Sequence, residues 1–194
     1  SNHYFPLEKS KGQTSIQIVS SGPDSETEAI RLGYLKMISS ANEYICIQTP
    51  YLIPDDAVMD ALELAVYSGI KVRIMIPSMP DHPFVYWATY SYLGDMVMAG
   101  ANCYTYNNGF LHSKGMIVDD RVLCYGTANM DIRSFALNFE VNAVIYDEKK
   151  AQEMVDIFQK DLEVCRQITR DYYVARRLKI RIKEQICRLL SPLL

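Results

Sequence analysis

A histidine and a lysine lie two residues apart in the apolar stretch "FLHSKGMIVDD", at positions His112 and Lys114. Basic side chains in a hydrophobic strand cost free energy unless a partner compensates them. Side chains alternate between the two faces of a strand, so we expect the imidazole and the ammonium group to point the same way. A buried anion between them would explain both residues; the alternative is a half-exposed strand that carries these residues by chance.

Residues that follow Lys114 in the sequence have the side chains expected of a site that binds a phosphate group, which is one candidate for the buried anion. Thr127 and Asn129 share one strand parity in "GTANMD", and Gly126 lets the backbone approach a ligand closely. Glu140 begins the next apolar strand, where an unpaired carboxylate would be costly. We expect Lys114 and Asn129 to contact the nonbridging phosphate oxygens, where charge gathers in phosphoryl transfer. For Asn129 the alternative is a turn in which the side chain bonds its own backbone.

The imidazole of His112 has two possible roles in such a site. A neutral imidazole, with a reference pKa of about 6.5, can attack phosphorus, and a protonated one can donate a proton. Glu140 is a candidate to hold the second imidazole nitrogen, as a triad aspartate does, or is an ordinary salt-bridge partner. Asp119 has the other parity and lies at the expected turn, so its geometry favours ordering the hairpin or a neighbouring segment.

The hydrophobic pattern predicts strands and helices that alternate early and a hairpin later. Strands are expected at 15–20, 43–54, 70–77, 101–106, 110–118, 121–129 and 139–147, and helices at about 26–40, 56–67, 81–100 and 148–170. Ser25 and Glu28 have capping-box spacing before the first helix, and Asp55 or Asp56 is the expected cap of the second. This order of elements predicts an α/β sandwich with a mixed β-sheet flanked by helices.

Composition is that of one globular domain: 194 residues, 49% hydrophobic and 22% charged. The net charge of −3 gives no general attraction to nucleic acid, and no run of eighteen apolar residues predicts a membrane span. The five cysteines lack CxxC spacing, so we expect reduced core thiols and no metal.

Residues 170–194 differ from the rest of the chain. They carry seven lysines and arginines against two acids, a net charge of +5, which leaves −8 on the other residues. Apolar residues recur there at helical spacing, at Ala175, Leu178, Ile182, Ile186, Leu189 and Leu193. Such a helix can lie on an anionic membrane or pack on the domain with a solvated basic face, and we favour packing.

The pattern His112-x-Lys114-x4-Asp119, followed by "GTAN" and a strand carrying Glu140, resembles the HKD motif of the phospholipase D superfamily. The stretches "SSGPDSE", "IQTPYLIPDD", "MPDHPFVYWA" and "LLSPLL" extend this likeness, which is to the C-terminal half of bacterial cardiolipin synthases and covers almost the whole chain. The resemblance implies a phospholipase D-like fold, no cofactor, and a place at the cell membrane, on its cytoplasmic leaflet.

The resemblance also implies a reaction. In that family one motif histidine attacks the phosphodiester of phosphatidylglycerol, and a second protonates the departing glycerol. The phosphatidyl-histidine then passes its group to another phosphatidylglycerol, which gives cardiolipin. By this likeness His112 is nucleophile or acid/base, Lys114 and Asn129 bind phosphate, and Asp119 completes the motif. Glu140 matches the family's carboxylate, with Gly126 and Thr127 in support.

The sequence contains one such motif, whereas in-line displacement needs a histidine on each side of phosphorus. Neither His3 nor His82 is followed by lysine two residues later. We therefore expect a half-site with little activity alone, completed by a missing N-terminal half or by a second copy across a two-fold axis. The opening "SN" suggests a tag remnant on a piece of a longer protein. We divide the chain into a lead-in (1–13), a phospholipase D-like domain (14–170) and a basic C-terminal helix (171–194).

Two other functions are compatible with the motif. A homodimeric phosphodiesterase or nuclease would need basic grooves and salt-sensitive binding, against which the acidic body of this chain argues; we expect no nucleic-acid partner. A catalytically silent scaffold would have no reason to keep His112, Lys114 and Asn129 together.

Overall fold

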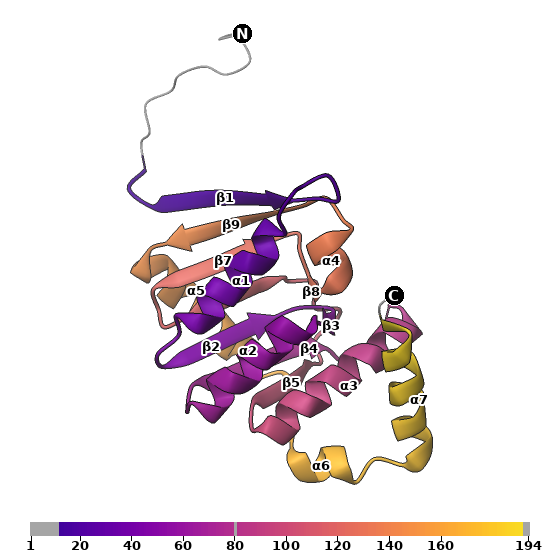
Figure 1. The fold of residues 1–194 in the computed structure, drawn as a ribbon. Coiled ribbons are helices and arrows are strands. Elements are labelled where there is room, and N and C mark those ends of the chain that lie inside the picture. The colour runs from indigo at the N-terminus through magenta and orange to yellow at the C-terminus, as the bar shows by residue number, and fades with distance from the viewer. Residues whose placement is uncertain (1–11, 80, 192–194) are drawn as a thin grey trace.

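Residues 12–79 and 81–191 are described by a computed structural model of the chain, and they form a mixed β-sheet between two layers of helices (Figure 1). In spatial order its strands are β1 (Ser15–Ser21), β9 (Glu140–Tyr146), β7 (Val122–Gly126), β6 (Gly115–Val118), β2 (Tyr44–Gln48), β4 (Lys71–Pro77), β5 (Asn102–Tyr106) and β10 (Cys165–Ile168). β2, β4 and β5 run parallel, and the other neighbours pair antiparallel. The predicted α/β fold with a mixed sheet is confirmed.

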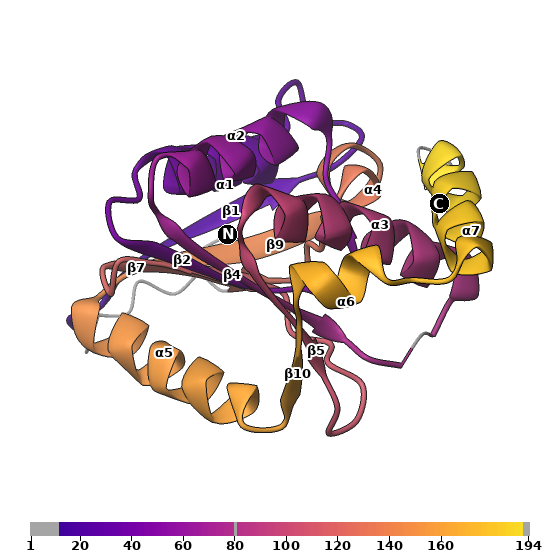
Figure 2. The ribbon, with the colours of Figure 1, turned by 90° about the horizontal axis from the view of Figure 1, so that it is seen from below.

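Helices cover both faces of this sheet. α1 (Ala29–Ser39), α2 (Asp56–Tyr67) and α3 (Pro83–Ala99) lie on one face, and α5 (Glu148–Leu162) lies on the other (Figure 2). α6 (Arg170–Val174) leads to α7 (Leu178–Leu189), which packs beside α3. The short strands β3 (Leu52–Ile53) and β8 (Met130–Asp131) pair in parallel, and α4 (Ile132–Ala136) follows β8. None of the helices in the described part of the chain is long and apolar enough to cross a bilayer.

The core follows from strand alternation. Ile45 and Ile47 of β2 belong to the cluster beneath α1–α3, whereas Cys46 between them faces the cluster beneath α5. Fully burying one such aliphatic side chain contributes about 1.5–3 kcal/mol. Because the described residues enclose both clusters by themselves, the chain has the core that an independently folding unit needs.

The predicted N-terminal cap is correct for α2 and wrong for α1. Asp55 caps α2 as expected, and its carboxylate accepts the Val58 N–H at 3.1 Å. The predicted capping box is wrong: α1 begins at Ala29, and Glu28 at its N-cap makes no side-chain cap bond. The hydroxyl of Ser21, at the end of β1, accepts the Ile30 N–H at 3.0 Å instead. A neighbouring strand therefore satisfies a helix-end donor that the sequence assigned to a local cap.

The later elements needed two corrections. The helix predicted over 148–170 ends at Leu162, and β10 follows it and pairs with the otherwise exposed edge of β5. The predicted hairpin is confirmed as β6–β7, with Asp119 and Asp120 at φ angles of 50° and 52°, the left-handed conformation that a tight hairpin turn requires. However, β6 begins at Gly115, so the predicted strand was too long at its start.

Candidate active site

His112 and Lys114 lie in the irregular segment between β5 and β6, just beyond the C-terminal end of β2. The Lys114 Nζ donates to the His112 carbonyl oxygen at 2.9 Å, which holds the ammonium group beside the histidine backbone. The exposed imidazole lies against the ring of Phe110, with centroids 5.6 Å apart. Within the described residues its two nitrogens make no hydrogen bond, so both are accessible to a ligand.

The ammonium group of Lys114 is a half-buried positive charge beside His112. Burial lowers the pKa of Lys114 because a half-buried charge loses hydration. The negative charges of Glu140, Asp131 and Asp81 oppose this shift. An anionic ligand would add a further opposite charge and favour the protonated ammonium group more strongly.

Gln48 anchors the segment, and sequence reasoning missed it. Its Oε1 accepts from the hydroxyl of Ser113 at 3.3 Å and from that of Tyr125 at 3.1 Å. Its Nε2 donates to Asp161 of α5 at 2.9 Å. Because Ser113 lies between His112 and Lys114 in the chain, its hydrogen bond to the buried Gln48 amide helps to hold both neighbours in position. The available signal was a polar residue at the end of the apolar strand "YICIQ".

Replacing Gln48 by methionine keeps the side-chain volume and removes its conventional hydrogen bonds. We expect a loss of about 1–3 kcal/mol in the free energy of unfolding, since partners are left unsatisfied. Urea denaturation measures this loss. An unchanged free energy of unfolding would refute the role of Gln48 as an anchor of the His112–Lys114 segment.

Asn129 lies between β7 and β8, with its backbone N–H donating to Ser134 Oγ at 3.1 Å. Its side-chain Oδ1 is buried and has no hydrogen-bond partner within the described residues. Asn129 lines a cavity of about 390 Å³, together with His82, Phe84, Arg133 and Ser191. His112 and Lys114 do not line this cavity, so the structure places Asn129 in an adjoining hollow.

A buried clamp positions the backbone before Asn129. Asn142 Oδ1 accepts the N–H of Ala128 at 3.2 Å, and the Tyr34 hydroxyl donates to the carbonyl of Ala128 at 3.3 Å. Asn142 Nδ2 in turn donates to the Tyr34 hydroxyl at 2.9 Å. Burial raises the pKa of Tyr34, so the hydroxyl stays protonated and remains a donor. The clamp satisfies the N–H and the carbonyl of Ala128 and so fixes the position of the backbone that leads into Asn129.

Gly126 and Thr127 have structural contacts. A side chain at Gly126 would meet Asn142 Oδ1 and the Val141 carbonyl oxygen, both at 2.3 Å, so the close approach here is to β9 rather than to an open ligand space. Thr127 Oγ1 accepts the Val141 N–H at 2.9 Å, and the Thr127 N–H donates to the Val141 carbonyl at 3.0 Å. Both residues therefore secure the strand that leads to Asn129.

Glu140 begins β9 and is half-buried. Its Oε1 accepts from Asn138 Nδ2 at 3.3 Å. The expected hydrogen bond to the His112 imidazole is not formed within the described residues. Glu140 does act on Lys114 through its charge, so it belongs to the electrostatic surroundings of the site.

Asp119 lies at the hairpin turn and points toward the start of β2. Its carboxylate accepts backbone N–H groups of Asn42 at 2.6 Å, Glu43 at 2.9 Å and Tyr44 at 2.8 Å. The third motif residue thus ties the β6–β7 hairpin to the strand on which Gln48 lies, as its parity predicted.

Replacing Asp119 by asparagine is expected to reduce stability by about 1–2 kcal/mol at neutral pH, because charge-assisted bonds are lost from a partly exposed site. Burial opposes the shift, but the backbone N–H groups hold the pKa of Asp119 below its usual range. A depressed carboxyl pKa stabilises the fold above the unfolded-state value of about 3.9. That contribution is lost as pH falls through the folded-state pKa. Denaturation at several pH values should show the gap between variant and wild type closing in acid; a constant gap would contradict this.

In the part of the chain that the structure describes, no three His, Cys, Asp or Glu side chains gather so as to hold a metal ion. The assembled groups are an exposed imidazole and an ammonium group beside it, and this pair suits an anionic phosphoester whose charge is met by Lys114. The Asn129 oxygen that lacks a partner is a hydrogen-bond acceptor, so it cannot donate to a phosphate oxygen.

Comparison with known proteins agrees with this chemistry. The family model described as "Cardiolipin synthase, PLD-like domain" matches residues 34–162. The chain is 57% identical to the major cardiolipin synthase ClsA of Bacillus subtilis, over 99% of this chain and 40% of that protein. It is also 57% identical to a cardiolipin synthase of Oceanobacillus iheyensis, over 95% of this chain and 39% of that protein. The chain therefore spans about 40% of the length of these curated relatives.

Solved structures show the same fold. The phospholipase D family member NUC of Salmonella typhimurium superimposes with a TM-score of 0.70 at 23% identity, over 81% of this chain and 99% of that chain. Phosphatidylserine synthase of Haemophilus influenzae superimposes with a TM-score of 0.69 at 16% identity, over 93% and 46%. At such identities the likeness establishes the architecture, which is the one expected from the sequence.

Proposed function

Because the chain belongs to the family of cardiolipin synthase PLD-like domains, we propose that it contributes one half of a site for phosphatidyl transfer between two phosphatidylglycerol molecules. The observation that carries the proposal is the 57% identity to a cardiolipin synthase over 99% of this chain. The accessible imidazole of His112 beside the Lys114 ammonium group supplies the chemistry.

In the first step a neutral imidazole nitrogen attacks phosphorus. A P–N bond forms, the P–O bond to glycerol breaks, and an acid on the opposite side gives the leaving oxygen its proton. In the second step the hydroxyl of another phosphatidylglycerol attacks phosphorus. It loses its proton to the group that protonated glycerol in the first step, which now acts as a base. The P–N bond breaks and cardiolipin leaves, so one glycerol is released for each cardiolipin formed.

Within this chain Lys114 stabilises the charge that gathers on the nonbridging oxygens, and Asn129 can add to this only through its Nδ2 donors. One Lys114 N–H is already used on the His112 carbonyl, which fixes the ammonium group and leaves two N–H donors for phosphate. Asp119 and Gln48 act indirectly, because their contacts hold the hairpin and the His112–Lys114 segment in place.

A second histidine must come from outside the His112 segment. The relatives are about two and a half times as long as this chain, so the rest of such a protein is one source. A second copy of the chain is the other source, with two His112 side chains meeting across a two-fold axis. The lipid substrates place the working enzyme at a membrane surface.

The test uses the full-length protein in vesicles of phosphatidylglycerol labelled in the headgroup glycerol. Cardiolipin and free glycerol are expected in equal amounts, with no loss in a metal chelator. Phosphatidate in place of cardiolipin would identify a hydrolase of the same superfamily, and absence of both products would overturn the proposal.

A further inference from the structure

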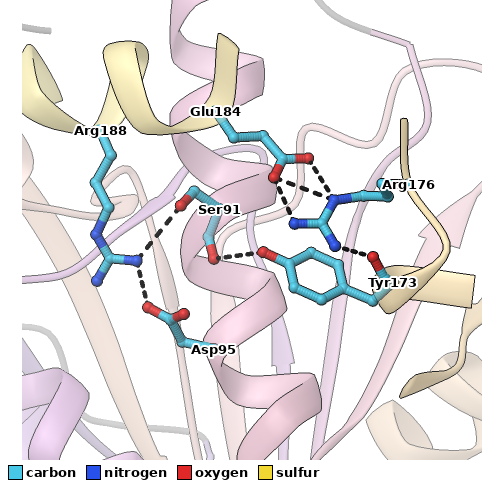
Figure 3. Close-up of polar contacts among 6 residues, drawn as sticks. All are labelled: Ser91, Asp95, Tyr173, Arg176, Glu184 and Arg188. Carbon is cyan, nitrogen blue, oxygen red and sulfur yellow. Dashed lines mark hydrogen bonds and ion pairs between the residues drawn. The ribbon is translucent and has the colours of Figure 1, made fainter. Parts of the chain in front are cut away.

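Helix α7 is amphipathic, but the side that faces the domain carries Glu184, Cys187 and Arg188 rather than most of its aliphatic residues. Glu184 is fully buried and Cys187 is 4% exposed, whereas an ordinary surface helix would turn its aliphatic residues inward. The carboxylate of Glu184 pairs with Arg176, at 2.7 Å from Nη2 and 2.9 Å from Nε (Figure 3).

Further polar contacts fix α7 to α3. Arg188 forms an ion pair with Asp95 and donates to Ser91 Oγ at 3.4 Å (Figure 3). The ammonium group of Lys183 lies 5.6 Å from the centre of the Trp87 ring. Charged side chains therefore set the orientation of α7 and turn the opposite side of the helix away from α3.

The opposite side is an apolar stripe. Leu178, Ile182, Ile186 and Leu189 are 69%, 50%, 52% and 82% exposed, and their spacing places them on one face of the helix. They border a shallow groove of about 590 Å³. The helix packs on the domain as favoured from the sequence, but these aliphatic residues are not the ones that pack.

The charges around this stripe indicate what covers it. Arg177, Lys179 and Arg181 are exposed and form no ion pair with any described residue. An aliphatic stripe bordered by unpaired cations fits an anionic lipid surface, where the aliphatic groups enter the interface and the cations meet headgroups.

The position of α7 connects this stripe with the candidate site. In Figure 1, α7 lies at the same edge of the molecule as β3, β8 and α4. Ser191, just after α7, lines the cavity that holds Asn129. A bilayer against α7 would therefore lie near the cavity that Asn129 lines.

We propose that the outward face of α7, formed by Leu178, Ile182, Ile186 and Leu189, docks on the surface of a bilayer containing anionic lipid. Docking itself depends only on this face, and its role in delivering substrate rests on the proposed function.

The test compares two double variants of this chain, whose enclosed core allows it to be studied alone. I182Q/I186Q removes the centre of the stripe. The matched control, L32Q/L64Q, changes residues that are 51% and 65% exposed on α1 and α2. Flotation with phosphatidylglycerol-containing vesicles should show binding of wild type and control, and at least about tenfold weaker partitioning of I182Q/I186Q. K179Q/R181Q should bind less tightly and with a weaker salt dependence.

Several outcomes would overturn docking. These are equal binding by I182Q/I186Q and the control, or no binding by wild type in low salt. A dimer in sedimentation that I182Q/I186Q dissociates, without vesicle binding, would assign the stripe to a second copy. Thermal unfolding of each variant verifies the fold.

A second arm separates this inference from the proposed function. The full-length enzyme carrying I182Q/I186Q should keep its activity on short-chain substrate in detergent and lose activity on vesicles. If no transfer is seen in either medium even with wild type, the proposed function fails while the flotation result still decides docking.

Discussion

Replacing His112 by alanine in the full-length enzyme is expected to lower phosphatidyl transfer by about 10³-fold or more. The imidazole has no hydrogen bond within the described residues and is exposed, so its removal should leave the fold intact. Lipid vesicles containing phosphatidylglycerol and quantification of cardiolipin provide the measurement. D60A changes an exposed residue of α2 and should behave as wild type.

Trapping the intermediate assigns the role of His112. Quenching wild type under denaturing, non-acidic conditions should yield a lipid-bearing protein whose linkage is acid-labile, as a P–N bond is. If His112 is the nucleophile, H112A gives no adduct; if it is the proton donor, an adduct remains but turns over slowly. Transfer by H112A within tenfold of wild type would refute both roles.

Strand alternation predicted much of the fold because it is a local property. Ile45, Ile47 and Cys46 reveal their two faces directly in the sequence, and the mixed sheet follows from the spacing of such segments. β10 could not be found in this way, because its pairing with β5 is a contact between residues about sixty positions apart. The predicted helix simply continued through it.

The site shows the same division. The spacing of His112 and Lys114 predicted that they lie together, and the structure places them side by side, although in an irregular segment rather than in a strand. Gln48 was missed because its role depends on hydrogen bonds to Ser113, Tyr125 and Asp161, which are distant in sequence.

Periodicity predicted α7 as a helix but not the side by which it packs. The apolar repeat pointed to Leu178, Ile182 and Ile186 as the inner face, yet these are the exposed residues. What decides the orientation is the pairing of Glu184 with Arg176, which precedes the helix. A buried ion pair of this kind leaves no periodic trace in hydrophobicity.

This ion pair gives the largest expected effect on stability. In R176M the carboxylate of Glu184, fully buried, would lose its cation, and breaking a buried pair from one side costs about 3–5 kcal/mol. Arg176 also lies over the Tyr173 ring, 3.2 Å from its centroid, and donates to the Tyr173 carbonyl, so packing is lost together with charge. Urea denaturation followed by circular dichroism provides the free energy of unfolding.

Two further variants identify the cause of that loss. In R176M/E184M the unpaired carboxylate is removed together with its partner, so stability should return to within about 1–2 kcal/mol of wild type, because apolar replacement of a buried pair is often nearly neutral. K150M breaks the Lys150–Glu153 pair, whose side chains are 51% and 47% exposed, and should cost less than about 1 kcal/mol. If R176M costs no more than K150M, the pair does not hold α7 in place. The contacts of Arg188 and Lys183 with α3 would then be the cause of the outward orientation of the aliphatic stripe.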